Sequence, residues 1–74
     1  MTKPALERIA RALCSHDGHP ENIQFEGEPM WRSYLSAART ALMAIREPTE
    51  RIRAATEGGW EAMVDAALKE GPAI

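Results

Sequence analysis

Apolar residues recur at helical spacing in three separate stretches of the chain. The first runs from Pro4 to about Ser15, and its apolar positions are Leu6, Ile9, Ala10 and Leu13. The second runs from Pro29 to about Arg46, and its stripe consists of Trp31, Tyr34, Leu35, Ala38, Leu42 and Ile45. The third begins at Trp60 and continues with Met63, Val64, Ala67 and Leu68. Steps of three and four residues keep side chains on one helical face, so the pattern predicts three amphipathic helices.

Prolines and glycines set the ends of these helices and add a short fourth one. The Glu47-Pro48 step ends the second helix, because proline moves the preceding residue out of the helical conformation. Pro48 also suits the first turn of a short helix that continues to about Thr56, with Ile52 and Ala55 as its apolar contacts. Glycines separate this helix from the last one, which ends at a Gly-Pro pair; the positions are Gly58, Gly59, Gly71 and Pro72.

Residues 16–28 form the only long stretch without helical periodicity. Gly18 suits a left-handed helix stop, and beyond it Ile23 and Phe25 alternate with polar neighbours. Such alternation is typical of a strand, but a lone strand has no partner elsewhere in this sequence. We therefore expect an ordered loop in which Ile23 and Phe25 are apolar anchors.

These elements predict a single all-α domain over residues 1–74, a small bundle or orthogonal array of three main helices plus one short helix. We expect the stripes to converge on Trp31, Tyr34 and Trp60, because aromatic residues on apolar helical faces are usually core. A tryptophan that proved exposed would instead point to an interface. The core is thin, because 13 of the apolar residues are alanines. One cysteine forms no intramolecular disulfide, so helix packing or oligomerisation must stabilise 74 residues.

Charge and hydropathy narrow the setting in which the protein works. The formal charge of -2 argues against non-specific binding to nucleic acid or to an anionic membrane. Glu7, Arg8 and Arg11 interrupt what would be the apolar core of a signal peptide, and no run of 18 uncharged apolar residues exists. With one unpaired cysteine, we expect a cytoplasmic protein without a membrane span.

One cluster, Cys14-x-His16-Asp17-x-His19, contains groups that bind metals or act as nucleophiles. Structural zinc sites usually draw ligands from two separated pairs, which one tight turn does not supply. Cys14 also lies at a helix C-terminus, where the dipole raises the pKa of a thiol rather than lowering it. We therefore expect Cys14 to pack as a small apolar residue, with no catalytic residue, no metal and no cofactor.

Arginines spaced by seven on the second helix form the most specific surface feature. Seven residues return the helix to within about 20° of its starting direction, so these side chains share one side. The predicted partner-binding residues are Arg32, Ser36, Arg39, Met43 and Arg46. In one interpretation the stripe binds an acidic protein surface or phosphates. In the other it is a solvated face that nearby glutamates neutralise, namely Glu26, Glu28, Glu47 and Glu50.

A nucleic-acid-binding alternative uses the turn at residues 46–49. In a helix-turn-helix arrangement, the short helix would be the recognition helix and Arg46, Arg51 and Arg53 would contact DNA or RNA. The turn length is suitable, but Glu47 and Glu50 would then face phosphates.

Two stretches resemble a set of small alanine-rich helical proteins encoded by phages and prophages of proteobacteria. They are WRSYLSAARTALMAIREPTE, residues 31–50, and WEAMVDAALKE, residues 60–70; the opening IARALC, residues 9–14, is similar too. No activity is established for that set, so the resemblance implies a genetic setting and no functional residues. Phages encode many small accessory proteins that bind and block a host machine, anti-CRISPR proteins among them.

These observations favour a non-enzymatic protein-binding module, a phage or prophage accessory protein that binds and modulates or inhibits a host protein complex. Its partner is then a host or phage protein in the host cytoplasm. Two alternatives stay open. One is a small DNA- or RNA-binding regulator, and the other is a homodimeric structural or assembly protein whose contact uses exposed apolar residues of the first and last helices.

Overall fold

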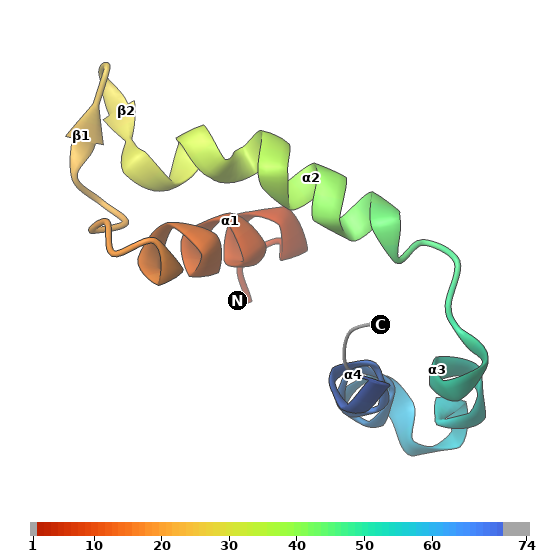
Figure 1. Ribbon diagram of the computed structural model, residues 1–74. Coiled ribbons are helices and arrows are strands. Elements are labelled where there is room, and N and C mark those ends of the chain that lie inside the picture. Colours follow the sequence, from red (N-terminus) through yellow and green to blue (C-terminus); the bar gives the residue numbers. More distant parts are fainter. Residues whose placement is uncertain (1, 71–74) are drawn as a thin grey trace.

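The computed structural model describes residues 2–70 and confirms the all-α class (Figure 1). Three main helices and one short helix follow one another along the chain, and two 3-10 turns and a small hairpin connect them. The helices are α1 (Ala5–His16), α2 (Leu35–Ala44), α3 (Glu50–Ala54) and α4 (Gly59–Glu70). The remaining elements are β1 (Gln24–Phe25), β2 (Glu28–Pro29), η1 (Met30–Tyr34) and η2 (Thr56–Gly58).

Helix α1 begins and ends close to its predicted limits. Pro4 precedes it in an extended conformation, and Gly18 follows it with a φ of +83°. The N–H of Asp17 donates to the carbonyl of Leu13, and that of His19 donates to the carbonyl of Cys14. These bonds satisfy carbonyls that the helix end leaves free, and the left-handed residue that permits them is the predicted glycine.

The segment between α1 and the second helix differs from the predicted loop. Gln24–Phe25 pairs antiparallel with Glu28–Pro29, across a two-residue turn in which Glu26 and Gly27 have φ values of 53° and 85°. The partner strand lies directly after the turn, so the expectation that no partner exists was wrong. Ile23 and Phe25 are about half exposed, at 51% and 47%, so they do not anchor the segment in a core.

The second predicted helix consists of two parts. Its first turn, η1, is 3-10, and the Ser33 hydroxyl donates to the Met30 carbonyl there. Helix α2 then ends at Ala44, two residues before the predicted end at Arg46. Residues 45–49 therefore form an open connection rather than a tight turn.

The short helix α3 begins at Glu50 rather than at Pro48, because Thr49 caps it. The side chain of Thr49 accepts a hydrogen bond from the backbone N–H of Ile52 at 3.2 Å. After η2, Gly59 starts α4 with a φ of +84°, a conformation that favours glycine. The predicted end of α4 at Gly71 and Pro72 lies outside the described residues.

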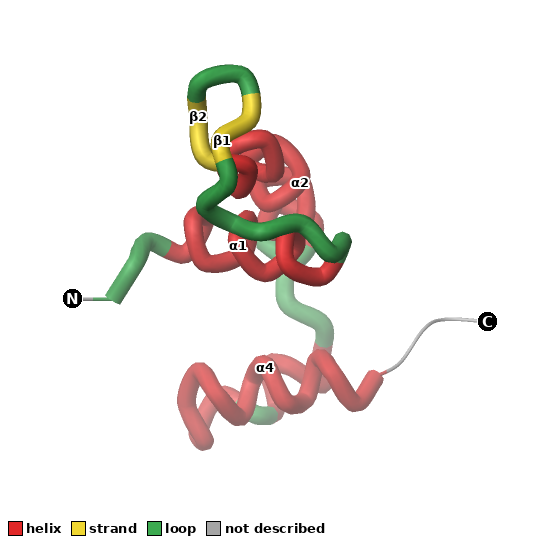
Figure 2. Tube along the Cα trace, turned by 90° about the vertical axis from the view of Figure 1, so that its left-hand side faces the viewer, coloured by secondary structure: helices red, strands yellow, loops and turns green. Residues whose placement is uncertain are grey.

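The helices pack as two pairs rather than around one centre (Figure 2). Helix α1 packs against η1 and α2, whereas α4 packs against α3 and η2. Within residues 2–70 the fully buried apolar side chains are Ala10, Cys14 and Ala38, all in the first pair. The predicted convergence on three aromatic residues was therefore wrong, because Trp60 belongs to the second pair and is 68% exposed.

Candidate binding cleft

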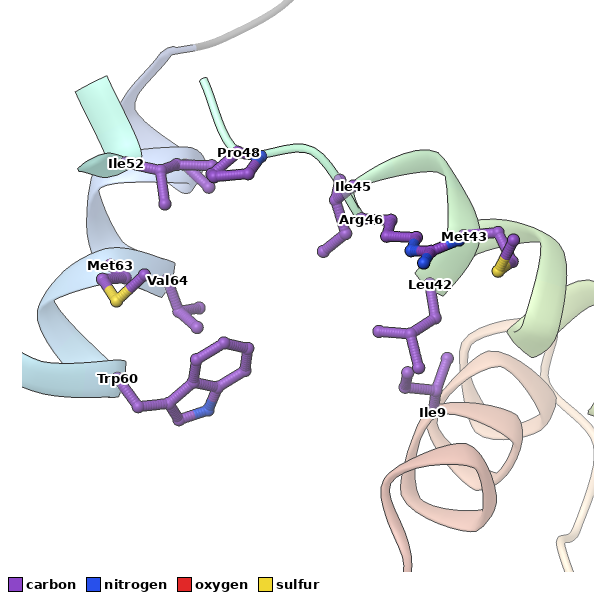
Figure 3. A pocket seen from close by; sticks show the side chains of 11 residues that line it. Ile9, Leu42, Met43, Ile45, Arg46, Pro48, Ile52, Trp60, Met63 and Val64 are labelled. Carbon is purple, nitrogen blue, oxygen red and sulfur yellow. The ribbon is translucent and has the colours of Figure 1, made fainter. Parts of the chain in front are cut away.

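A cleft of about 520 Å³ separates the two helix pairs. Figure 3 shows Trp60, Met63 and Val64 on one side, and Ile9 and Leu42 on the other. All but one of the lining residues are apolar; they are Ile9, Leu42, Met43, Ile45, Arg46, Pro48, Ile52, Trp60, Met63, Val64 and Ala67. A concave apolar surface with one charged side chain at its edge has the composition of a binding site.

The first wall is formed by the C-terminal end of α2 with Ile9 of α1. Ile45 has left the helical conformation, and its N–H reaches the Leu42 carbonyl at 3.3 Å. Met43 and Ile45 are 58% and 56% exposed, so this wall presents apolar surface that no other part of residues 2–70 covers. The early end of α2 shapes this wall, because a helix continuing to Arg46 would give the side chain of Ile45 another direction.

The second wall is the apolar face of α4, with Pro48 and Ile52 beside it. Trp60, Val64 and Leu68 lie four residues apart, and their exposed fractions are 68%, 36% and 75%. Gly58 brings η2 close to α4, since a Cβ at this position would lie 2.6 Å from the Cβ of Ala62. The close approach lets α3 and η2 pack against α4, and the Trp60 side of α4 faces the cleft (Figure 3).

Charged residues at the edge of the cleft differ in sign between its two sides. Arg46 lines the cleft on the α2 side, while Glu61 and Asp65 lie beside Trp60 on α4. Arg8 of α1 shares with those two acids a neighbouring hollow of about 360 Å³. Among the described residues, none of these four side chains forms an ion pair within 4.0 Å.

The predicted arginine stripe is divided by the structure. Arg32 forms an ion pair with Glu28 at 3.0 Å and lies 5.6 Å from the centre of the Trp31 ring. Met43 and Arg46 line the cleft. Ser36 and Arg39 are exposed on α2 and do not line it. The seven-residue repeat loses its alignment because η1 is 3-10 and because α2 ends before Arg46.

The glutamates predicted to neutralise this stripe do so at one position. Four ion pairs are found in residues 2–70, and the only one of them that joins one of these glutamates to an arginine of the stripe is the pair between Glu28 and Arg32. Arg39 and Arg46 form no ion pair there, so they remain available to an external anion or carboxylate.

The nucleic-acid alternative receives no support from the arrangement of α2 and α3. Helix α3 contains five residues and packs against α4 and η2, whereas a recognition helix packs against the helix that precedes it. Arg51 and Arg53 are exposed on α3, and the Nε of Arg53 donates to the Pro48 carbonyl at 3.4 Å.

The thiol of Cys14 is buried at the end of α1. Its Sγ donates to the His19 carbonyl at 3.6 Å. Burial raises the pKa of this thiol, and the negative charges of Glu21 and Asp17 raise it further. The geometry is that of the predicted packed cysteine, and the direction of the pKa change opposes nucleophilic chemistry. Across residues 2–70, no three His, Cys, Asp or Glu side chains are grouped so as to hold a metal ion.

Sequence reasoning missed most of the cleft because it assigned these residues to a core. Leu42, Ile45, Trp60, Met63 and Val64 all lie on apolar helical stripes, and a stripe has the same pattern whether it faces a neighbouring helix or a cleft. The available signal was the weakly apolar helix at residues 48–56, which offers α4 little to bury against. The rule that an exposed tryptophan marks an interface now applies to Trp60.

No helix in the described part of the chain has the length and apolar character needed to cross a membrane. Comparisons of the chain with models of protein families, with curated proteins and with solved structures find no match.

Proposed function

We propose that this protein is a non-enzymatic binding module that takes a helical segment of a partner protein into its apolar cleft. The observation that carries the proposal is the exposure of Trp60, 68%, opposite Ile45, which is 56% exposed. Large exposed apolar side chains that face one another cost free energy in water, and a bound apolar surface removes that cost. Tryptophan is the side chain most enriched at the centres of such interfaces.

A helix is the occupant that fits the shape and composition of this site. Helical partners bind grooves lined by other helices through apolar side chains at positions i, i+3, i+4 and i+7. The cleft offers apolar side chains from both helix pairs, and Arg46 is the one charged residue that lines it. A helix with acidic residues beside its apolar face would place them near Arg46.

The setting we propose is a phage or prophage accessory protein that binds and modulates or inhibits a host protein complex, for example a defence complex. The support is the resemblance of residues 31–50 and 60–70 to small phage-encoded proteins, together with a surface that suits stoichiometric binding. The partner is a host or phage protein in the cytoplasm.

The test is capture of partners from a bacterial lysate with the tagged full chain, followed by quantitative mass spectrometry. Two variants of equal chemistry are compared: Ile45→Glu, in the cleft, and Ile23→Glu, on the hairpin. The two isoleucines are 56% and 51% exposed, so both substitutions leave folding intact. We expect Ile45→Glu to capture at least about tenfold less of the partner protein than the natural chain does, and Ile23→Glu to capture as much. Equal capture by both variants would refute the cleft as the binding surface.

A further inference from the structure

The surface of α4 has the apolar face and the flanking acidic residues that we expect of a helix bound in the cleft. Trp60, Val64 and Leu68 form its exposed apolar face, and Glu61 and Asp65 flank this face. We propose that, without a partner protein, the occupant of the cleft is α4 of a second copy of the chain. Helix α4 of each copy then packs against the wall that α1 and the end of α2 form in the other copy. This inference rests on the proposed function, because it assigns an occupant and a form of regulation to the same site.

Charge complementarity between the two surfaces supports this occupant. Arg46 lines the wall that the end of α2 forms, and Arg8 of α1 lines the neighbouring hollow. Neither arginine forms an ion pair within its own chain among residues 2–70. The flank of α4 carries Glu61 and Asp65, which are likewise unpaired there. Opposite charges therefore approach each other when α4 of one copy meets the wall of another.

The distribution of buried residues also favours a second copy. Neither α3 nor η2 nor α4 contains a fully buried side chain, whereas the first helix pair contains Ala10, Cys14 and Ala38. A chain of 74 residues buries about 60% of the surface that its unfolded form exposes, less than a larger domain does, and oligomerisation is a common remedy. Every copy carries both the wall and the complementary helix, so two copies satisfy both contacts in one closed two-fold dimer.

Such a dimer gives the binding module a built-in regulation. The cleft of each copy is occupied as long as the dimer persists, so a partner helix must compete with α4 of the second copy. Partner binding and self-association then exclude each other, and raising the concentration of the protein weakens its apparent affinity for the partner.

Sedimentation equilibrium of the full chain tests the dimer directly. Over about 1 to 200 μM we expect the mass to rise from the 8.2 kDa of one chain toward twice that value. Ile45→Glu should weaken the association at least about tenfold, and Ile23→Glu should leave it unchanged. A monomer across the whole range overturns the proposal. A dimer that Ile45→Glu does not weaken also overturns it, because the contact then lies elsewhere.

An experiment that exchanges charges distinguishes a dimer of two copies from closure of the cleft within one chain. One variant carries Arg8→Glu and Arg46→Glu, and the other carries Glu61→Lys and Asp65→Lys. Each variant alone should dimerise more weakly than the natural chain, because like charges meet. An equimolar mixture should form a heterodimer, since both of its contacts then join opposite charges. Formation of that heterodimer also shows that both variants fold. A mixture that stays monomeric overturns the proposal, since closure within one chain gains nothing from mixing.

The two proposals fail in distinguishable ways. If the chain is monomeric but Ile45→Glu abolishes capture from the lysate, the binding function stands and the dimer does not. If the dimer forms through Ile45 but capture is unaffected by Ile45→Glu, the dimer stands and the proposed binding surface for other proteins does not.

Discussion

The Tyr34 hydroxyl donates a hydrogen bond of 2.8 Å to a carboxylate oxygen of Asp17, and this bond joins η1 to the end of α1. Asp17 is the residue that follows α1, and Tyr34 is the last residue of η1. The bond thus joins both ends of the hairpin segment, residues 17–34, through two side chains. It also holds the first helix pair together at the end where the hairpin of β1 and β2 lies (Figure 1).

This bond predicts a loss of stability at alkaline pH. The hydrogen bond to Asp17, burial and the charge of Asp17 raise the pKa of Tyr34 from 10.0 to about 12. A group whose pKa is higher in the folded state contributes stability below its unfolded pKa and loses it as the pH rises through the folded pKa. We expect the urea midpoint to fall between pH 10 and about 12, more in the natural chain than in Tyr34→Phe.

The chain contains one tyrosine, so the absorbance of tyrosinate reports Tyr34 alone. Asp17→Asn should bring the midpoint of this titration back toward 10.0. A titration with the ordinary tyrosine pKa in the natural chain would contradict the hydrogen bond.

Cys14 should resist alkylation in the folded protein. Its Sγ is buried and its pKa is raised, so little thiolate forms at neutral pH and reagents do not reach it. We expect iodoacetamide to modify the native chain slowly and the urea-unfolded chain fully, as measured by mass spectrometry. Rapid modification under native conditions would show that the end of α1 opens often.

Replacing the threonine that caps α3 should lower the stability of the protein, whereas replacing a threonine inside a helix should raise it. Thr49→Ala removes the acceptor for the N–H of Ile52, and we expect a loss of about 1 kcal/mol in the free energy of unfolding. Thr40 instead donates to the Ser36 carbonyl within α2. Since alanine has the higher helix propensity, Thr40→Ala should stabilise the protein by a few tenths of a kcal/mol, up to about 0.7. Urea denaturation of both variants decides whether the two effects have opposite signs.

The two tryptophans should respond differently to truncation. Trp31 is half-buried, and the guanidinium carbon of Arg11 lies 4.8 Å from the centre of its ring. Trp31→Ala should therefore cost about 2 kcal/mol or more. Trp60→Ala should change the stability of the monomer by less than about 0.5 kcal/mol, because Trp60 is 68% exposed. A large loss for Trp60→Ala, measured by urea denaturation of the dilute monomer, would show that Trp60 packs in a core.

The hairpin shows what pattern reasoning overlooked. Alternation at Ile23 and Phe25 correctly indicates extended backbone. The partner strand is not distant in the sequence, because it begins at Glu28, directly after the two-residue turn that follows Phe25. The Glu26-Gly27 step was the available signal, because such a turn needs positive φ at both central residues and glycine supplies one of them. Glutamate at the other position is uncommon, which weakened the signal.

The sequence by itself determined the class of the protein, the order of its helices and the limits of α1. Those properties depend on local physics: apolar spacing, the Gly18 stop, and the proline that separates the second helix from the third. The tertiary structure alone decided which apolar faces meet. It buried Ala38 between α1 and α2 and left Trp60 facing a cleft, although both lie on equally regular stripes. Periodicity gives a face its direction around a helix axis, but the packing of the chain decides whether that face meets another helix or water.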